Sequence, residues 1–178
     1  ASMTYMIATG LSVASMIRVG NQKGLKAFKE LRRIAFSIFL LGFLIEFGFA
    51  LLFVLFNELL PQIYLDVDDV ANMKDNMEVI KTASELLIVA ALFQISDGVQ
   101  VTVLGALRGL QDVKVPTTIT FIAYWIVGFP VMYYLGLKTE LQSAGIWLGL
   151  LAGLTVSAVL LFIRFNRLTV KLIDKSPN

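Results

Sequence analysis

Asp97 lies in the middle of the stretch 84–107, which is apolar and long enough to cross a membrane. An ionised carboxylate in that environment costs several kcal/mol unless it is paired or hydrated. If the stretch is helical, Gln94 and Gln100 fall about 60° to either side of Asp97. The three side chains therefore form one polar facet, which must face other helices or a water-filled cavity.

This facet is suited to binding a small cation. Carboxylate and amide oxygens suit a hard ion such as Na⁺, and a carboxyl group can also take up a proton. No Lys or Arg lies inside any of the apolar stretches, so an ion pair that would hold Asp97 for packing alone has no partner there. The sequence predicts a site for Na⁺ or H⁺ at Asp97, with Gln94 and Gln100 beside it; a carboxylate held by packing is the alternative.

Two other apolar stretches carry uncharged polar stripes, and a third carries a second acid. Such stripes either bond neighbouring helices together or line a cavity for an organic substrate. The second acid either lines the same cavity or is protonated against a neighbouring helix. These residues form the predicted lining of a substrate cavity: Tyr5 and Thr9, Thr120 and Tyr124, and the acid Glu46.

The amino-acid composition indicates which kind of protein positions these residues. Of 178 residues, 57% are hydrophobic and 16% are charged, and the mean hydropathy is +0.79. Such a chain has too few charges for a soluble domain and too much apolar surface for a disordered one. It has no Cys and no His, which removes thiol and His-based catalysis. We expect no enzyme activity, no cofactor and no nucleic-acid partner; paired carboxylates leave an intramembrane enzyme as a weak alternative.

Apolar segments of about 20 helical residues are long enough to cross the roughly 30 Å hydrocarbon core of a bilayer. The sequence contains five such segments and is predicted to be an all-α integral membrane protein. The five spans belong to one transmembrane unit, 1–167, and a tail, 168–178, follows it. The predicted spans are 1–17, 34–56, 84–107, 116–136 and 144–163.

The basic residues predict the orientation. If successive spans cross in opposite directions, twelve of the fifteen Lys and Arg residues lie on one side of the membrane. Positively charged loops remain in the cytoplasm. We therefore expect a multi-pass protein of the inner, cytoplasmic membrane, with its C-terminus in the cytoplasm.

Glycine and proline mark two structural features of the later spans. Gly145, Gly149 and Gly153 are spaced four apart and predict one smooth face for close helix packing. Pro130 removes a backbone hydrogen bond inside the fourth span and predicts a kink. The glycine face is structural and is expected to carry no chemistry, whereas the kink is either a static bend or a hinge in a transport cycle.

Four short motifs, in this order, resemble the multidrug and toxic compound extrusion (MATE) family. Arg18-Val19-Gly20-Asn21 is similar to the end of the second helix of each half of that family. The segment 93–100 and the loop that follows it resemble the tenth helix and its cytoplasmic loop. The remaining similarities to helices ten, eleven and twelve are Gly105-Ala106-Leu107-Arg108-Gly109 with Asp112, then Pro116, Tyr124-Trp125, Gly128 and Pro130, then Gly145, Trp147, Gly149 and Leu150.

The resemblance implies a twelve-helix antiporter with two six-helix lobes, which exports organic cations in exchange for Na⁺ or H⁺. This chain would be the C-terminal lobe without its first helix. Its partners would be the bilayer, the N-terminal lobe, that first helix and small organic cations. Asp97 matches the aspartate of the family's cation site, whose partner glutamate lies on the seventh helix, and Tyr5 is expected to add an oxygen from the eighth helix. Phe93 stands where some members have a tyrosine, so Na⁺ and H⁺ both remain candidates.

Two further functions stay open at this point. A flippase for a lipid-linked precursor has a related architecture, but it is expected to carry basic residues in its cavity. A membrane scaffold without transport activity would explain the glycine face, but not an aspartate flanked by two glutamines in mid-membrane.

Overall fold

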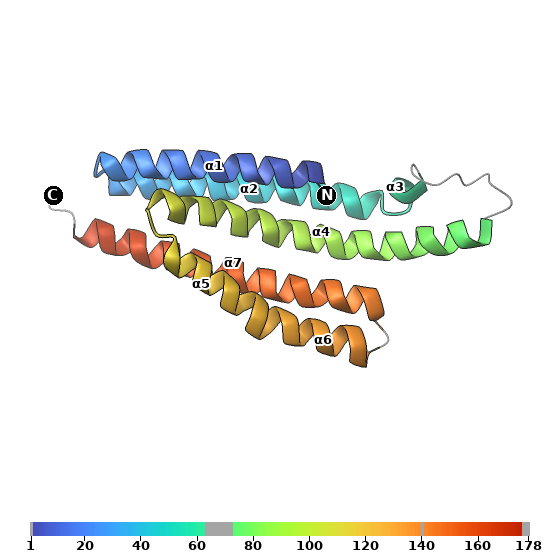
Figure 1. The fold of residues 1–178 in the computed structure, drawn as a ribbon. Coiled ribbons are helices and arrows are strands. Elements are labelled where there is room, and N and C mark those ends of the chain that lie inside the picture. Colours follow the sequence, from blue (N-terminus) through green and yellow to red (C-terminus); the bar gives the residue numbers. More distant parts are fainter. Residues whose placement is uncertain (1, 63–72, 140, 176–178) are drawn as a thin grey trace.

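A computed structural model describes residues 2–62, 73–139 and 141–175 of the chain. These residues form a bundle of long helices, with no strand among them (Figure 1). The bundle confirms the all-α prediction. The helices are α1 (Ser2–Gly24), α2 (Phe28–Leu55), α3 (Leu59–Gln62), α4 (Met73–Gly109), α5 (Lys114–Ile122), a π-helical turn η1 (Ala123–Gly128), α6 (Phe129–Lys138) and α7 (Gln142–Asp174).

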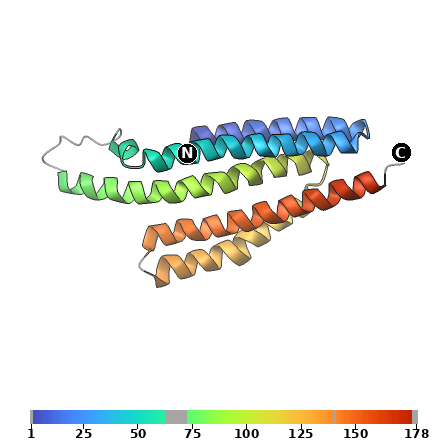
Figure 2. The same cartoon turned by 180° about the vertical axis from the view of Figure 1, so that it is seen from behind.

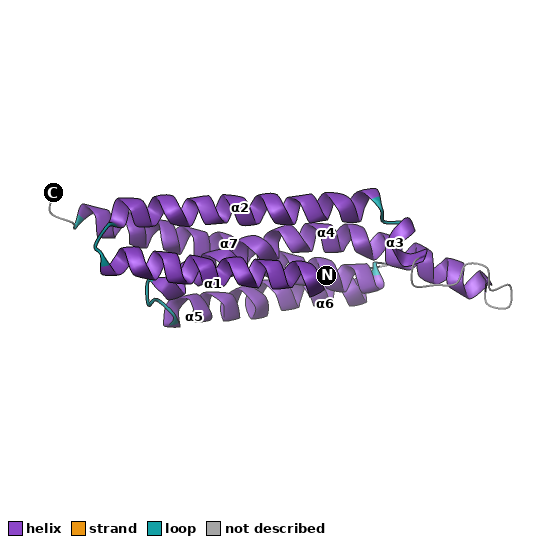
Figure 3. Ribbon diagram, turned by 90° about the horizontal axis from the view of Figure 1, so that it is seen from above, coloured by secondary structure: helices purple, strands orange, loops and turns teal. Residues whose placement is uncertain are grey.

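The five predicted spans correspond to α1, α2, α4, the continuous α5–η1–α6 segment and α7. Four helical segments are long and apolar enough to cross a membrane: Phe28–Leu55, Val79–Gly109, Lys114–Lys138 and Ser143–Asp174. The fifth helix, α1, is more polar, because Thr4, Ser12 and Ser15 lie on its buried face. It nevertheless packs along α2 and α4 as part of the same bundle (Figure 3).

The helices are longer than the apolar segments that predict them. Residues 18–33, which connect the first two predicted spans, are mostly helical, because α1 continues to Gly24 and α2 begins at Phe28. A tight turn joins them, with Lys26 in the left-handed region at φ 56°. At the other terminus α7 continues to Asp174, so the first part of the predicted tail 168–178 is helical. A helix satisfies its own backbone hydrogen bonds in lipid and in water alike, so apolar sequence alone does not mark its ends.

Helix α4 is central and packs against α1, α2 and α7, whereas α6 and η1 pack against α7. The contact between α1 and α4 brings backbone against backbone. A Cβ atom at Gly105 would lie 2.2 Å from the Ser12 carbonyl oxygen, so only glycine fits there. The Ser12 hydroxyl also donates a hydrogen bond to the Val101 carbonyl oxygen at 2.7 Å. Small residues thus replace apolar bulk as the means of close packing between these helices.

The predicted glycine face of the last span is confirmed. A Cβ atom at Gly149 would lie 2.2 Å from the Met132 Cα atom, and one at Gly145 would lie 2.4 Å from the Leu135 carbonyl oxygen. The backbones of α6 and α7 therefore meet directly. Pro130 follows a π-helical turn, in which the Phe129 N–H donates to the carbonyl five residues earlier. This turn is the form in which the helix accommodates the proline predicted to kink it.

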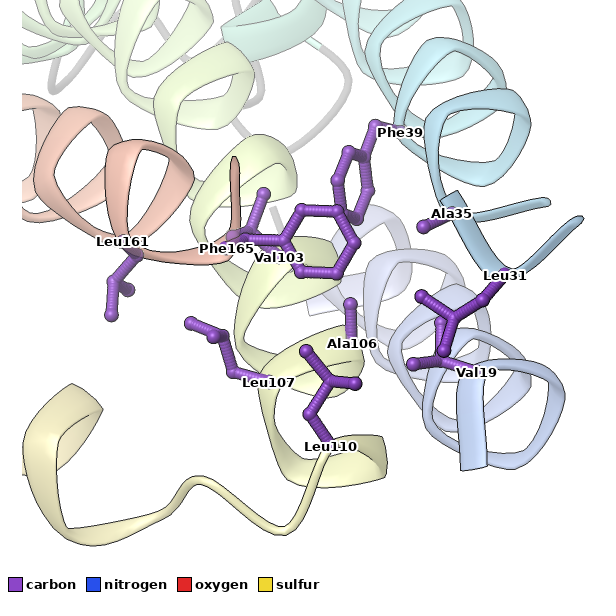
Figure 4. Packing of buried hydrophobic residues seen from close by; sticks show 10 residues of the cluster. All are labelled: Val19, Leu31, Ala35, Phe39, Val103, Ala106, Leu107, Leu110, Leu161 and Phe165. Atoms are coloured by element: carbon purple, nitrogen blue, oxygen red, sulfur yellow. The ribbon is translucent and has the colours of Figure 1, made fainter. Parts of the chain in front are cut away.

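One end of the bundle is basic and tightly packed. The α1–α2 turn, the α4–α5 connection and the C-terminal end of α7 share this end, as both side views show (Figure 1, Figure 2). The twelve basic residues counted above lie in these three segments or in the helix ends that adjoin them. The main hydrophobic core joins four helices near this end (Figure 4): Val19, Leu31, Ala35, Phe39, Val103, Ala106, Leu107, Leu110, Leu161 and Phe165.

Polar contacts fasten the same end. The Arg164 side chain pairs with the Asp112 carboxylate at 2.9 Å, which links α7 to the α4–α5 connection. Lys23 Nζ donates to the Leu110 carbonyl oxygen at 2.8 Å, which links α1 to that connection. These two contacts hold α1, α7 and the α4–α5 connection together at the basic end of the bundle.

Candidate functional site

A cavity of about 450 Å³ lies between α1, α2, α4 and α7, beyond the hydrophobic core. It brings together four of the residues that the sequence predicts for the cation site and the substrate cavity: Asp97, Gln94, Glu46 and Tyr5. These residues come from three different helices, so the polar stripe of a single helix does not predict that they lie together. The complete lining is Thr4, Tyr5, Met6, Glu46, Ala90, Phe93, Gln94, Asp97 and Trp147.

Gln94 ties three helices together at the cavity wall. Its side chain is buried, and its Oε1 atom accepts a hydrogen bond from the Thr4 hydroxyl of α1 at 3.0 Å. Its Nε2 group donates to the Glu46 backbone carbonyl of α2 at 3.5 Å. A buried amide with partners on both sides is held in one orientation. Gln94 therefore fixes α1 and α2 relative to α4 at the level of the two acids.

Glu46 is almost completely buried, with 1% of its surface exposed. Both of its carboxyl oxygens lack a hydrogen-bond partner among the residues that the structure describes. Gly98 makes room for this side chain, since a Cβ atom there would lie 2.4 Å from the Glu46 Cγ atom. A buried polar group without a partner costs about 1–3 kcal/mol, and more if it is charged. Glu46 is thus placed at an energetic cost that packing does not explain.

Asp97 is partly buried and lines the same cavity as Glu46. Because both side chains line one cavity, two ionised carboxylates there would repel each other. No Lys or Arg is among the lining residues, so no fixed positive charge balances them in the described part of the chain. Acids in this position attract a mobile cation.

Aromatic rings form another part of the wall. The Phe93 ring on α4 and the Trp147 ring on α7 meet edge to face, with centroids 5.7 Å apart and planes at 85°. Trp147 is 40% exposed and Tyr5 is 53% exposed, so both rings are accessible beside the acids. Aromatic faces attract organic cations within about 6 Å. Carboxylates and aromatic rings together suit a site for positively charged ligands.

The structure does not bring the remaining predicted residues to this cavity. Gln100 accepts a hydrogen bond from the Tyr124 hydroxyl at 3.4 Å, on the side of α4 that faces η1. The Thr9 hydroxyl donates to its own helix, at the Tyr5 carbonyl oxygen, 2.8 Å away. Thr120 lies beside the Ser157 hydroxyl at 3.3 Å and lines a second cavity of about 360 Å³ near Arg108.

The divergence of Gln94 and Gln100 follows from helix geometry. They lie about 120° apart around α4, which is wider than the contact surface with a single neighbouring helix. One therefore faces α1 and α2, and the other faces η1. Among the described residues no group of three or more His, Cys, Asp or Glu side chains gathers into a site. A cation in the cavity would therefore use the two carboxylates and neutral oxygens.

Sequence reasoning gave Thr4, Met6 and Ala90 no part in the site. The sequence contains a pattern that could have identified Thr4, because small residues recur at positions 4, 8, 12 and 15 of α1 and form its buried face. That three- and four-residue spacing is typical of a helix face packed against a neighbour. Met6 and Ala90 are ordinary apolar residues whose position beside a cavity has no sequence signal.

Comparison with known proteins identifies relatives along nearly the whole chain. The family model described as MatE matches residues 1–134. The probable multidrug resistance protein NorM of Rhodopseudomonas palustris is 40% identical over 169 residues, which cover 95% of this chain and 35% of that protein. The multidrug resistance protein MdtK of Proteus mirabilis is 35% identical and covers 90% and 34%. The chain thus spans about a third of the length of these curated relatives.

Solved structures show the same fold. The crystal structure of the eukaryotic MATE transporter AtDTX14 has a TM-score of 0.80 at 19% identity and covers 98% of this chain and 38% of that one. The inward-facing conformation of a multidrug resistance MATE family transporter of the MOP superfamily has a TM-score of 0.82 at 16% identity, covering 99% and 39%. At these identities the agreement shows the arrangement of helices.

Proposed function

We propose that this chain, which belongs to the MatE family and is part of a multi-pass membrane protein, works in an antiporter that exports organic cations in exchange for Na⁺ or H⁺. The relatives carry names that refer to multidrug resistance. Because they are about three times as long as this chain, the complete transporter includes further helices. We assign this chain to the C-terminal lobe, with residues 1–167 as its membrane part.

The observation that carries the proposal is the acidic cavity. Asp97 and Glu46 line it together, and no basic side chain does so among the described residues. A cavity that handled a lipid-linked phosphate would need positive charge to hold its anionic group. Two carboxylates repel such a group and attract cations. The charge of the cavity therefore favours cation exchange over the flippase alternative.

The proposed mechanism couples two ligands through their preference for different arrangements of the helices. The coupling cation binds at Asp97, and Gln94 and Tyr5 line the same cavity. An organic cation binds in the cleft and favours the other arrangement. Coupling of this kind requires only that each ligand has different affinities for the two states.

The substrate side of the proposal uses the aromatic wall. Phe93 and Trp147 meet edge to face beside the acids, so a flat organic cation can lie against a ring with its charge toward Asp97. Thr9, Thr120 and Tyr124 lie outside this cavity. We assign them to surfaces that the remaining helices of the full-length protein complete.

The basic end of the bundle supports an orientation in the inner membrane. Positive residues concentrate at cytoplasmic ends of membrane helices. The α1–α2 turn, the α4–α5 connection and the end of α7 would therefore lie on the cytoplasmic side, and the cavity nearer the outer side. A cysteine at Lys175 should accordingly react with a membrane-impermeant maleimide only in inverted vesicles.

The full-length protein in proteoliposomes tests the proposed function. A fluorescent cationic dye should leave the vesicles when an opposing Na⁺ or H⁺ gradient is imposed, and the effective gradient names the coupling ion. Asp97→Asn should abolish this response, whereas Glu85→Gln, an exposed acid of the same helix, should retain it. Gradient-independent dye movement, or transport of a lipid-linked sugar instead, would refute the proposal.

A further inference from the structure

Glu46 is a buried acid that the proposed antiport uses only as part of the negative charge of the cavity, with no ligand assigned to it. It lies on α2, a helix that the sequence links to the site by no polar stripe. Its side chain is 1% exposed, and both carboxyl oxygens lack a hydrogen-bond partner among the described residues. It also lines the cavity that contains Asp97. An unpartnered carboxylate at a cavity wall is free to bind what enters the cavity.

The local structure is built around this carboxylate. Gly98 of α4 lies against the Glu46 side chain and has no side chain of its own. A Cβ atom at this position would lie 2.4 Å from the Glu46 Cγ atom. Gln94, one turn away on α4, donates to the Glu46 backbone carbonyl and holds α2 in place. Asp97 lies between Gln94 and Gly98 in sequence, so the two acids meet at the same level of the bundle.

An apolar residue would fill this position at lower cost. Leucine or methionine would pack against Gly98 without a desolvated carboxyl group. Two ionised acids near one another also repel each other unless a cation lies with them or one of them takes up a proton. The observed arrangement combines both costs, and a bound cation removes both at once.

From this geometry we infer that Glu46 and Asp97 together bind a single Na⁺ ion between α2 and α4. The inference rests on the proposed antiport and adds to it a second carboxylate ligand and the choice of ion. Two carboxylates supply up to four oxygens of the kind that hard cations prefer. The cavity of about 450 Å³ leaves room for the ion to retain water. The ion would connect α2 and α4 through one carboxylate from each helix, so its binding would affect both helices.

The test measures Na⁺ binding directly on the full-length protein in detergent, by titration calorimetry and by ²²Na⁺ retention. The wild type should bind Na⁺, and Glu46→Gln should weaken the affinity by about tenfold or more or remove one ion per molecule. Asp97→Asn should do the same. Glu85→Gln is the matched control, because the same chemical change is made on an exposed acid of α4, and it should bind like the wild type.

A double variant distinguishes one shared ion from two separate ones. If both acids hold the same Na⁺, Glu46→Gln combined with Asp97→Asn should lose no more binding than the worse single variant. Separate and additive losses would overturn the inference. So would wild-type affinity in Glu46→Gln, or absence of Na⁺ binding by the wild type at this site.

A conservative variant keeps the inference testable if Glu46→Gln does not fold. Glu46→Asp retains a carboxylate on a side chain one methylene shorter, and its affinity should fall between those of the wild type and Glu46→Gln. Unchanged affinity in Glu46→Asp would contradict a direct ligand role. Binding in detergent needs no transport, so the inference can fail while gradient-driven dye efflux persists, and the proposed function can fail while Na⁺ still binds.

Discussion

Gly98→Ala is the substitution that most directly perturbs the site without changing any of its acids. The added methyl group would lie 2.4 Å from the Glu46 Cγ atom and 3.3 Å from its Cδ atom. Ordinary contact begins near 3.4 Å, so the Cγ atom must move by about 1 Å. Cγ is fixed by the first side-chain torsion, for which a helix offers only two favourable values. The carboxylate must therefore leave its present position, or α2 must move away from α4.

The cost can be estimated from two opposing effects. Overpacking a well-packed contact costs about 1–3 kcal/mol. Replacing glycine by alanine inside a helix returns about 1 kcal/mol through helix propensity. The net loss of stability is therefore about 0–2 kcal/mol, which leaves the protein folded. The displaced carboxylate should matter more, and we expect coupling-cation affinity to fall by about tenfold.

Two assays separate these effects. Thermal unfolding in detergent measures stability, and the ion concentration that gives half-maximal dye efflux measures coupling. Gly48→Ala on α2 is the control, because no described heavy atom lies within 4 Å of a Cβ there, and it should not alter efflux. If Gly98→Ala leaves the half-maximal ion concentration unchanged, the proposed role of the Glu46 position is wrong.

Three further predictions concern other parts of the bundle. Gly149→Ala places a methyl group 2.2 Å from the Met132 Cα atom, so it should cost about 1–3 kcal/mol and lower the unfolding temperature in detergent; an unchanged temperature would contradict the packing of α6 on α7. Asp112→Asn breaks the ion pair with Arg164, whose side chains are 15% and 35% exposed, and should cost at most about 1 kcal/mol while efflux continues; loss of efflux would give this pair a role in transport. Trp147→Ala should raise the KM for a cationic dye about 2- to 30-fold, whereas Trp147→Phe should raise it less; equal KM values in all three proteins would exclude a ring contact with the substrate.

The positions of the helices could be predicted from the sequence, but their ends could not. A mostly apolar segment that is long enough to cross a bilayer has few alternatives to a helix, since its backbone groups must bond internally. Beyond the hydrocarbon, α1 continues through Arg18 to Gly24, and α7 continues through Lys171 to Asp174. Charge marks where the lipid ends and does not mark where the helix ends.

Part of the site could also be predicted, because polar residues are rare in membrane-spanning helices. Asp97 and Gln94 are conspicuous in an apolar helix, and the structure places both at one cavity. Gln100 is equally conspicuous, yet it bonds with Tyr124 across a different interface. Helical periodicity gives the angle between two side chains around the helix axis. Which face of the helix borders a cavity depends on how the neighbouring helices pack against it.

Glu46 shows what pattern analysis could not resolve. In the sequence it is an acid among phenylalanines, compatible with a cavity wall or with burial against a neighbour. The decisive partner is Gly98, which lies about fifty residues away and has no side chain to reveal the contact. A pairing between a large residue and an absent side chain depends on the register of two helices, which the sequence alone does not determine.

We propose that the full-length protein exchanges an organic cation for a small one, and reversing the driving force tests this proposal most directly. Full-length protein in liposomes would be given an outward gradient of cationic dye with no ion gradient, and entry of Na⁺ or H⁺ would be recorded. Coupling is reciprocal, so the dye gradient should drive the small cation inward. We expect that movement in the wild type and its loss in Asp97→Asn. Dye exit without any countermovement of Na⁺ or H⁺ would contradict the account.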